Sequence, residues 1–278
     1  MHLIGEAGDG NVSGYAVIWC PDFRLQAVVR RVSWREEPVA LVDDQQRQSI
    51  ILARNVAASR EGVEVAMKTL QALARCPALR VERPSASGEL AAGRCLLETA
   101  LRWVPRVEET EPGLLTLDLS TQVEEAWLES GRRIRGWLYD LGFEVAVGVG
   151  ETPSLARIAA LAAWQQGGSL WHLHRDNRME LLDGLPLMVA ETGEDLNERL
   201  RLWGIETLGA FARLRREAVA SRLGEEGVNL WMRLTGRLRR PLKLARLEQL
   251  FEEHHDFDYE VCDLSLIHIS EPTRHLDI

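Results

Sequence analysis

The chain has 278 residues, 46% of them hydrophobic, which is enough for a proper core and, at about 150 residues per domain, for about two domains. Its net charge of -9 taken alone disfavours nucleic acid, and no apolar run reaches the roughly 18 residues of a membrane span. Residues 1–14 have no basic region followed by an apolar one, so we expect a disordered lead-in and not a secretory signal. Widely spaced cysteines without a CxxC pair argue against a zinc site and a disulfide framework, and favour the cytoplasm: Cys20, Cys76, Cys95 and Cys262.

The first hundred residues predict alternating strands and helices. "YAVIWCPDF" (15–23) has the composition of a buried strand, and the amphipathic "RLQAVVRRV" after it predicts a helix. "PVALV" and "SIILA", separated by a polar turn, predict a β-hairpin. Near-helical spacing of apolar residues predicts one helix over "EGVEVAMKTLQALARC" and another over "GELAAGRCLLETALRWV", stopped by Pro77 and Pro105.

The middle of the chain predicts a core strand followed by further helices and strands. "EETEPGLLTLDLS" (108–120) is interpreted as a single strand opened by a Pro-Gly corner. After it come the helix "STQVEEAWLESGRRIRGWLYDLG", the strand "FEVAVGVG" and the helix "SLARIAALAAWQQG". This order predicts a ferredoxin-like α+β fold rather than a Rossmann fold. From Pro186 onward the pattern predicts only short helices separated by glycines.

Two features near the C-terminus are unusual. Between Arg199 and Arg246 there are twelve Lys/Arg against four Asp/Glu, and residues 229–246 contain six basic residues and no acid. A local basic strip matters more to a polyanion than the total charge does. "LSLIHISEPTR" (264–274) resembles a translated sequencing adapter, so we expect the natural sequence to end near Asp263.

Several stretches in the same order resemble the Y-family of translesion DNA polymerases. Residues 62–81 resemble the passage from fingers to palm, residues 146–163 the palm strand, turn and helix under the incoming triphosphate, and residues 200–214 the helix-hairpin-helix of the thumb. The resemblance implies an α+β fold with a ferredoxin-like split palm, a small fingers insertion and an all-α thumb. The implied boundaries are palm at 15–25 and 76–165, fingers at 26–75, thumb at 166–245, the start of a little-finger domain at 246–263 and a non-native tail at 264–278.

The resemblance breaks at the metal-binding positions. Nucleotidyl transfer needs two Mg²⁺ ions held by carboxylates on adjacent palm strands, and Mg²⁺ requires oxygen ligands. The family's Asp-x-Asp falls on Trp19 and Pro21, and its Asp-Glu pair falls on Gly113 and Leu114. We therefore expect no catalytic residue, metal or cofactor. Mg²⁺ would be needed only if a slip of alignment hides an acid, such as the neighbouring Asp22 or Asp118.

The family's contacts to the triphosphate are also mostly missing. Its Tyr-x-x-Arg falls on Val56 and Ser59, and the first lysine of the palm turn falls on Pro153. Arg157 keeps a basic side chain one helical turn later and is interpreted as a vestigial triphosphate contact.

The thumb keeps part of the family's DNA contact. A helix-hairpin-helix binds phosphate through backbone amides at a helix N-terminus, with glycines that allow close approach. Gly193, Gly204 and Thr207 match this motif, whereas Glu191 replaces its other glycine and would repel a phosphate. We expect the adjacent basic strip to supply affinity through counterion release, from Arg233, Arg237, Arg239, Arg240 and Lys243.

The pattern is most similar to the ImuB type, the catalytically inactive Y-family homologue of bacterial mutagenesis cassettes. The resemblance implies a cytoplasmic scaffold of SOS-type mutagenic repair that binds primer-template DNA without sequence preference. Its implied partners are the sliding clamp, an error-prone replicative-type polymerase and a RecA-like accessory protein. The segments that bind these partners lie beyond the little finger in that family, so we expect this chain to lack them.

Two alternatives stay open: an active Y-family polymerase with displaced carboxylates, and a helix-hairpin-helix module on an unrelated α+β domain. If the alignment is right, Trp19 and Leu114 lie side by side on adjacent strands. One further pair, His172 and His174, has the spacing of two metal ligands on a strand, but the sequence offers no third ligand and we expect no metal there.

Overall fold

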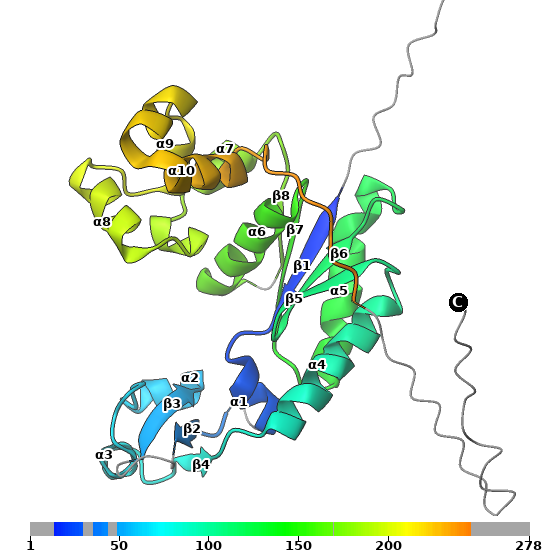
Figure 1. The fold of residues 1–278 in the computed structure, drawn as a ribbon. Coiled ribbons are helices and arrows are strands. Elements are labelled where there is room, and N and C mark those ends of the chain that lie inside the picture. Colours follow the sequence, from blue (N-terminus) through cyan, green and yellow to red (C-terminus); the bar gives the residue numbers. More distant parts are fainter. Residues whose placement is uncertain (1–13, 30–35, 44–48, 169, 246–278) are drawn as a thin grey trace, which may run out of the picture. The chain divides into compact units, whose positions relative to one another are not determined.

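The computed structural model describes residues 14–29, 36–43, 49–168 and 170–245 (Figure 1). Apart from Gly14, the expected lead-in lies outside these ranges, as do the expected start of the little finger and the expected non-native tail. No helix in the described ranges combines the length and apolarity of a membrane span.

The main element is a five-stranded sheet in the order β5-β6-β1-β7-β8. The central strand β1 is antiparallel to both of its neighbours, β6 and β7, and β7 is parallel to the edge strand β8. The strands are β1 Tyr15–Trp19, β5 Val107–Glu111, β6 Leu114–Asp118, β7 Ala146–Gly150 and β8 Leu170–Leu173. With helices between the strands, this is the expected α+β fold with the order of a split palm.

Helices cover both faces of this sheet (Figure 1). On one face lie α4 (Ala86–Leu101) and α5 (Glu124–Asp140), and on the other lies α6 (Pro153–Gln165). Successive residues of β7 face opposite sides of the sheet and show this division. Val147 contacts α5 near Gly131, whereas Gly148 lies against the backbone of α6. A Cβ atom at Gly148 would overlap α6 backbone atoms of Ala156 and Ala160, so glycine is what lets the helix approach this closely.

The segment expected as one strand at 108–120 is a β-hairpin, so that expectation is wrong. The strands β5 and β6 pair in an antiparallel fashion, and the chain reverses at Pro112 and Gly113. Gly113 has φ 80°, which a glycine adopts without steric cost. The three glutamates before the turn therefore belong to a separate edge strand and not to a polar lead-in.

A second, three-stranded sheet in the order β3-β2-β4 lies between α1 and α4 in the chain. The predicted hairpin forms its antiparallel pair, β2 and β3. The elements here are α1 Phe23–Val28, β2 Val39–Asp43, β3 Ile50–Arg54, α2 Val56–Arg60, α3 Thr69–Arg75 and β4 Arg80–Glu82.

The single helix expected from Glu61 to Cys76 is wrong in its first half, since α3 begins only at Thr69. Ala66 has φ 66°, outside the right-handed helical region, and its amide donates to the carbonyl of Ile51. Val63 and Met67 are buried in the core of this sheet. Their helix-like spacing therefore comes from an irregular segment that follows the edge of β3.

The last part of the described chain contains helices and no further strand of either sheet, as expected after Pro186, but α10 has 19 residues and is not short. They pack around one apolar core that also includes Leu161 and Ile158 of α6. One of them, α10, contains a kink at Gly224, whose φ of 64° and ψ of -150° are not helical. The elements are α7 Arg178–Asp183, the 3-10 helix η2 Leu187–Ala190, α8 Glu194–Leu202, α9 Leu208–Ala212 and α10 Arg216–Leu234.

Candidate nucleic-acid interface and metal-binding positions

Trp19 and Leu114 lie directly opposite each other on the adjacent strands β1 and β6. The amide of Cys20 donates to the carbonyl of Gly113 at 2.8 Å, which continues the pairing past the last residue of β1. Leu114 is buried in an apolar cluster with Val17, against which Trp19 packs. The two positions that the resemblance assigns to metal ligands on neighbouring strands are thus brought together, with apolar side chains.

The surroundings of Trp19 are equally apolar. Its ring contacts Trp164 of α6 edge-on, with ring centroids 6.2 Å apart. Pro21 is buried in the turn after β1, and a Cβ atom at Gly113 would meet Phe23 at 2.6 Å. None of these groups carries an oxygen ligand for a hard cation.

The nearest acidic candidates do not replace the missing carboxylates. Asp118 pairs with Tyr15 at the opposite end of β1 from Trp19, and its carboxylate accepts from the amide of Ser120 at 2.9 Å and pairs with Arg106 at 3.3 Å. Asp22 is exposed in the turn after β1, with φ 48°. Over the described ranges, no group of three or more His, Cys, Asp or Glu is arranged to hold a metal ion.

Arg157 lies between two carboxylates. Its guanidinium donates to Glu111 of β5 at 2.8 Å and to Glu191, which follows η2, at 2.6 Å. Burial alone would lower the pKa of Arg157, but these hydrogen bonds outweigh it and raise the pKa above its usual value. The expected vestigial triphosphate contact is therefore a cation that already holds two internal anions.

Two of the thumb positions that match the family's hairpin lie at helix starts, and the third, Gly204, follows the end of α8. Gly193 is the N-cap of α8, and Thr207 caps α9 by accepting from the amide of Ala210 at 3.1 Å. Gly204 has φ 72° and no atom within 4 Å of a Cβ placed on it. Glu191, where the motif would have glycine, has φ 50° and ψ 45°, so the backbone keeps a conformation that favours glycine.

The basic strip after α10 is partly engaged inside the molecule. Arg240 donates two hydrogen bonds to the buried carboxylate of Glu108, at 2.6 and 2.8 Å, and the amide of Lys243 donates a third at 2.8 Å. Burial alone would raise the pKa of Glu108, yet these bonds hold the pKa below its usual value. Arg233 donates to the carbonyl of Ala190 at 3.0 Å.

The remaining members of the strip are directed to solvent. Arg239 and the side chain of Lys243 are exposed, and Arg237 is exposed with its guanidinium 4.8 Å from the ring centroid of Trp231. The structure thus leaves three of the five expected basic contacts open to a polyanion.

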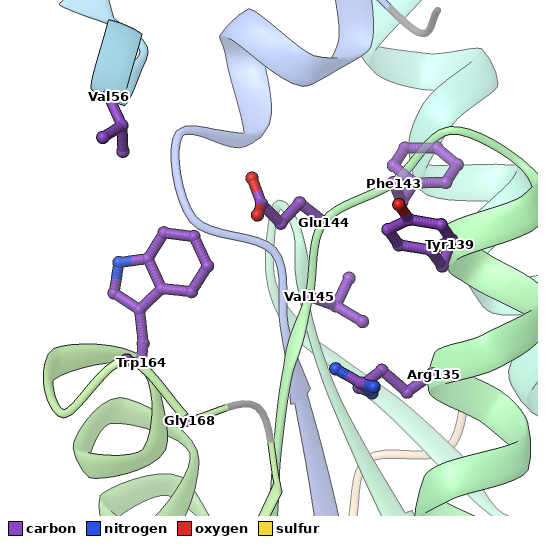
Figure 2. Close-up of a pocket in the computed structure, with 9 residues that line it drawn as sticks. Val56, Arg135, Tyr139, Phe143, Glu144, Val145, Trp164 and Gly168 are labelled. Carbon is purple, nitrogen blue, oxygen red and sulfur yellow. The ribbon is translucent and has the colours of Figure 1, made fainter. Parts of the chain in front are cut away.

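A cavity and a pair of histidines lie outside these positions. A cavity of about 460 Å³ lies beside the start of β7 and is lined by Trp164, Tyr139 and Val56, among others; Figure 2 shows Trp164 on one side, Glu144 and Val145 at the centre, and Tyr139 beyond them. His174 pairs with Glu124 at 3.0 Å, and burial lowers the pKa of His172. These histidines belong to no metal cluster of three or more within the described part of the chain.

A family model described as the impB/mucB/samB family matches residues 18–161, about half of the chain. The chain belongs to the impB/mucB/samB family. The match covers β1 through most of α6, including the paired positions Trp19 and Leu114.

Curated relatives of this impB/mucB/samB protein are DNA polymerases. DNA polymerase IV of Alkaliphilus oremlandii is 28% identical over 195 residues, which are 67% of this chain and 48% of that protein. DNA polymerase IV of Yersinia enterocolitica is 26% identical over 255 residues, 87% of this chain and 71% of that protein. The chain thus spans about half the length of the first relative and about seven tenths of the second.

Solved structures show that the fold is that of Y-family polymerases. A crystal structure of DinB from Sulfolobus solfataricus matches with a TM-score of 0.68 at 18% identity, over 82% of this chain and 69% of that one. An insertion ternary complex of Dbh DNA polymerase matches with a TM-score of 0.68 at 17% identity, over the same shares. The chain therefore has the fold of these polymerases.

Sequence reasoning on this family member missed the contacts made over long distances in the chain. The pairs Arg157–Glu191 and Arg240–Glu108 join residues 34 and 132 positions apart. The only sequence signal for the first pair is a glutamate at a position that favours glycine.

Proposed function

We propose that this chain is a polymerase-shaped, DNA-binding accessory protein of translesion synthesis that does not itself transfer nucleotides. The observation that carries the proposal is the apolar pair formed by Trp19 and Leu114 on adjacent strands. A two-metal mechanism needs carboxylates on these strands, close enough for two ions a few ångströms apart to share them.

The chemistry of the surrounding acids supports the same proposal. Glu111, opposite Leu114 in the hairpin, accepts a hydrogen bond from Arg157, and Glu108 accepts one from Arg240. A carboxylate in a short ion pair with arginine would have to give up that partner before it could hold Mg²⁺. This argues against displaced carboxylates as a replacement metal site.

DNA binding is supported by the fold and by the exposed basic residues. Similar structures include one titled an insertion ternary complex of a DNA polymerase. Arg237, Arg239 and Lys243 follow α10 and are exposed, and cations of this kind bind phosphates without reading sequence. The N-caps of α8 and α9, at Gly193 and Thr207, are the proposed backbone contacts to phosphate.

The role that fits such a protein is that of an ImuB-type scaffold, which binds DNA without catalysing nucleotide transfer. It places the chain in mutagenic, SOS-type repair, where it would hold primer-template DNA for a separate polymerase. The sliding clamp, the error-prone replicative-type polymerase and the RecA-like accessory protein are the proposed partners.

The experiment has a catalytic arm and a binding arm. Primer extension with Mg²⁺ or Mn²⁺ is expected to give no template-dependent product, whereas a DNA polymerase IV run alongside it does. Template-dependent extension above background would refute the proposal.

In the binding arm, fluorescence anisotropy with a labelled primer-template is run over a series of salt concentrations. Arg239→Gln is expected to weaken binding equally for all sequences and to reduce the salt slope by about one. The control is Arg132→Gln, on the palm helix α5, where the arginine is 63% exposed and paired with Glu129. Absence of salt-dependent binding by the wild-type chain would remove the DNA-binding half of the proposal.

A further inference from the structure

A cavity of about 440 Å³ lies between the hairpin β5-β6, the start of α6 and the helices after η2. Three arginines and one glutamate are the charged groups that line it, together with hydroxyl and amide side chains: Arg157, Arg233, Arg240, Glu191, Ser154, Thr110, Thr116 and Asn229. The lining therefore carries an excess of positive charge and many hydrogen-bond donors, which is the composition of an anion site.

Arg157 and Arg233 both lie close to the carboxylate of Glu191. Arg157 donates to Glu191 at 2.6 Å, and its side chain is 21% exposed. Arg233 has no carboxylate at ion-pair distance within the described part of the chain; it donates to the carbonyl of Ala190, the residue before Glu191. Burial lowers the pKa of Arg233 and the charge of Arg157 lowers it further, with Glu191 acting in the opposite sense. Glu191 is thus the anion that offsets the repulsion between the two cations.

The backbone at Glu191 is unusual for the residue that it carries. Its φ of 50° and ψ of 45° place it in the left-handed region, which is strained for a residue other than glycine. Its side chain is 42% exposed, so burial of apolar surface does not explain the choice of glutamate. What a glutamate provides at this position is a carboxylate that lies beside Arg157 and Arg233 and offsets their repulsion.

We propose that Arg157 and Arg233 form a binding site for a phosphate group, and that the carboxylate of Glu191 occupies this site in the free protein as an internal competitor. The inference deepens the proposed function and rests on it, because DNA is one source of the phosphate. A free polyphosphate or nucleotide is the other source. Either ligand must displace Glu191, whereas Glu111 keeps its bond to Arg157 at 2.8 Å and holds the guanidinium in place.

The first test measures the affinity for inorganic tripolyphosphate by calorimetry, without DNA. Glu191→Gln removes the competing charge and is expected to bind tripolyphosphate about tenfold more tightly than the wild type. Glu194→Gln is the matched control, since Glu194 is an exposed glutamate in the first turn of α8 that forms no ion pair with Arg157 or Arg233 in the described structure. The gain should vanish in the double variant Arg157→Gln/Glu191→Gln.

Three results would overturn the proposal: no gain in Glu191→Gln, an equal gain in Glu194→Gln, or a gain that persists without Arg157. Glu191→Gly serves as a second variant, because glycine adopts the left-handed conformation without strain and is expected to keep the fold. It should show the same gain, with a melting temperature no lower than that of the wild type.

The second arm separates this inference from the proposed function. Binding of a labelled primer-template is compared for the wild type and Glu191→Gln. A parallel gain for DNA identifies the DNA backbone as a source of the phosphate. If tripolyphosphate binds as expected but no variant binds DNA, the proposed DNA-binding function fails while the phosphate site stands, and its ligand is a free polyphosphate.

Discussion

Glu108 connects the segment after α10 to the sheet, and its loss should be measurable as a loss of stability. The carboxylate is 7% exposed and accepts two hydrogen bonds from Arg240 and one from the amide of Lys243. In Glu108→Gln the side chain keeps its size but loses its charge and half of its acceptor capacity.

The expected cost follows from these contacts. Removing one partner of a fully buried ion pair costs about 3–5 kcal/mol, and hydrogen bonds to charged groups contribute about 1.5–3 kcal/mol. Arg240 is 40% exposed, so water can solvate its guanidinium after the partner is lost. The expected cost therefore lies below that of a fully buried ion pair and within the range for hydrogen bonds to charged groups. We expect Glu108→Gln to lower the free energy of unfolding by about 2–3 kcal/mol.

The assay is urea unfolding followed by circular dichroism, with Glu109→Gln as the control because Glu109 is exposed on the same strand. The pKa of Glu108 is lowered in the folded state, so its contribution is fully present above the ordinary carboxyl pKa of about 4.3 and is lost as the pH falls through the folded pKa. The two proteins should therefore converge in stability only in strong acid. A cost below about 0.5 kcal/mol, or one equal to that of Glu109→Gln, would refute the reasoning.

Five other substitutions, at four positions, test the fold by the same unfolding assay. Gly148→Ala places a methyl group against the backbone of α6 and should lower the free energy of unfolding by about 1–3 kcal/mol. Gly136→Ala, whose new methyl group has no atom within 4 Å, should stabilise α5 by about 0.5–1 kcal/mol. Equal effects of the two substitutions would mean that α6 does not lie this close to β7. Asn55→Ala leaves two amides, those of Val39 and Ala58, without their acceptor and should cost about 2–4 kcal/mol, and a neutral result would contradict the buried cap. Thr207→Ala should cost about 1 kcal/mol and Thr207→Ser much less, since serine keeps the hydroxyl that caps α9.

Elements with a clear local pattern could be predicted from the sequence. The hairpin of β2 and β3 follows from two β-branched runs around a polar turn, and α5 and α6 follow from their helical spacing. The pairing of Trp19 with Leu114 was expected from the family resemblance, and the two residues are paired in the register of β1 and β6. That pairing is the geometric condition which the alignment of these two strands had to meet.

The misses have physical causes. Residues 62–68 have apolar side chains at helical spacing, but Ala66 is hydrogen-bonded to Ile51 of β3, and tertiary pairing outweighs local propensity there. The strand β5 could not be predicted from its own residues, because a buried glutamate is unusual in a strand. Glu108 is buried only because Arg240, 132 residues away, pairs with it. Glu191 was expected only as a repulsive group, since nothing local in the sequence indicates that Arg157 lies within reach.

The apolar contact between Trp19 and Leu114 also limits how a metal site could be introduced at this strand pair. A single acid introduced at Leu114, which is 3% exposed, would be desolvated among Val17, Ala156 and Ala160. Arg157, which lines the same cavity as Leu114, already binds Glu111 and Glu191, so the new acid would have to compete for it. No one substitution supplies a metal to offset the desolvation, because a two-metal site needs several carboxylates at once. Each of these substitutions made alone is therefore expected to lower the stability of the fold, so a metal site at this strand pair could be installed only by several substitutions made together.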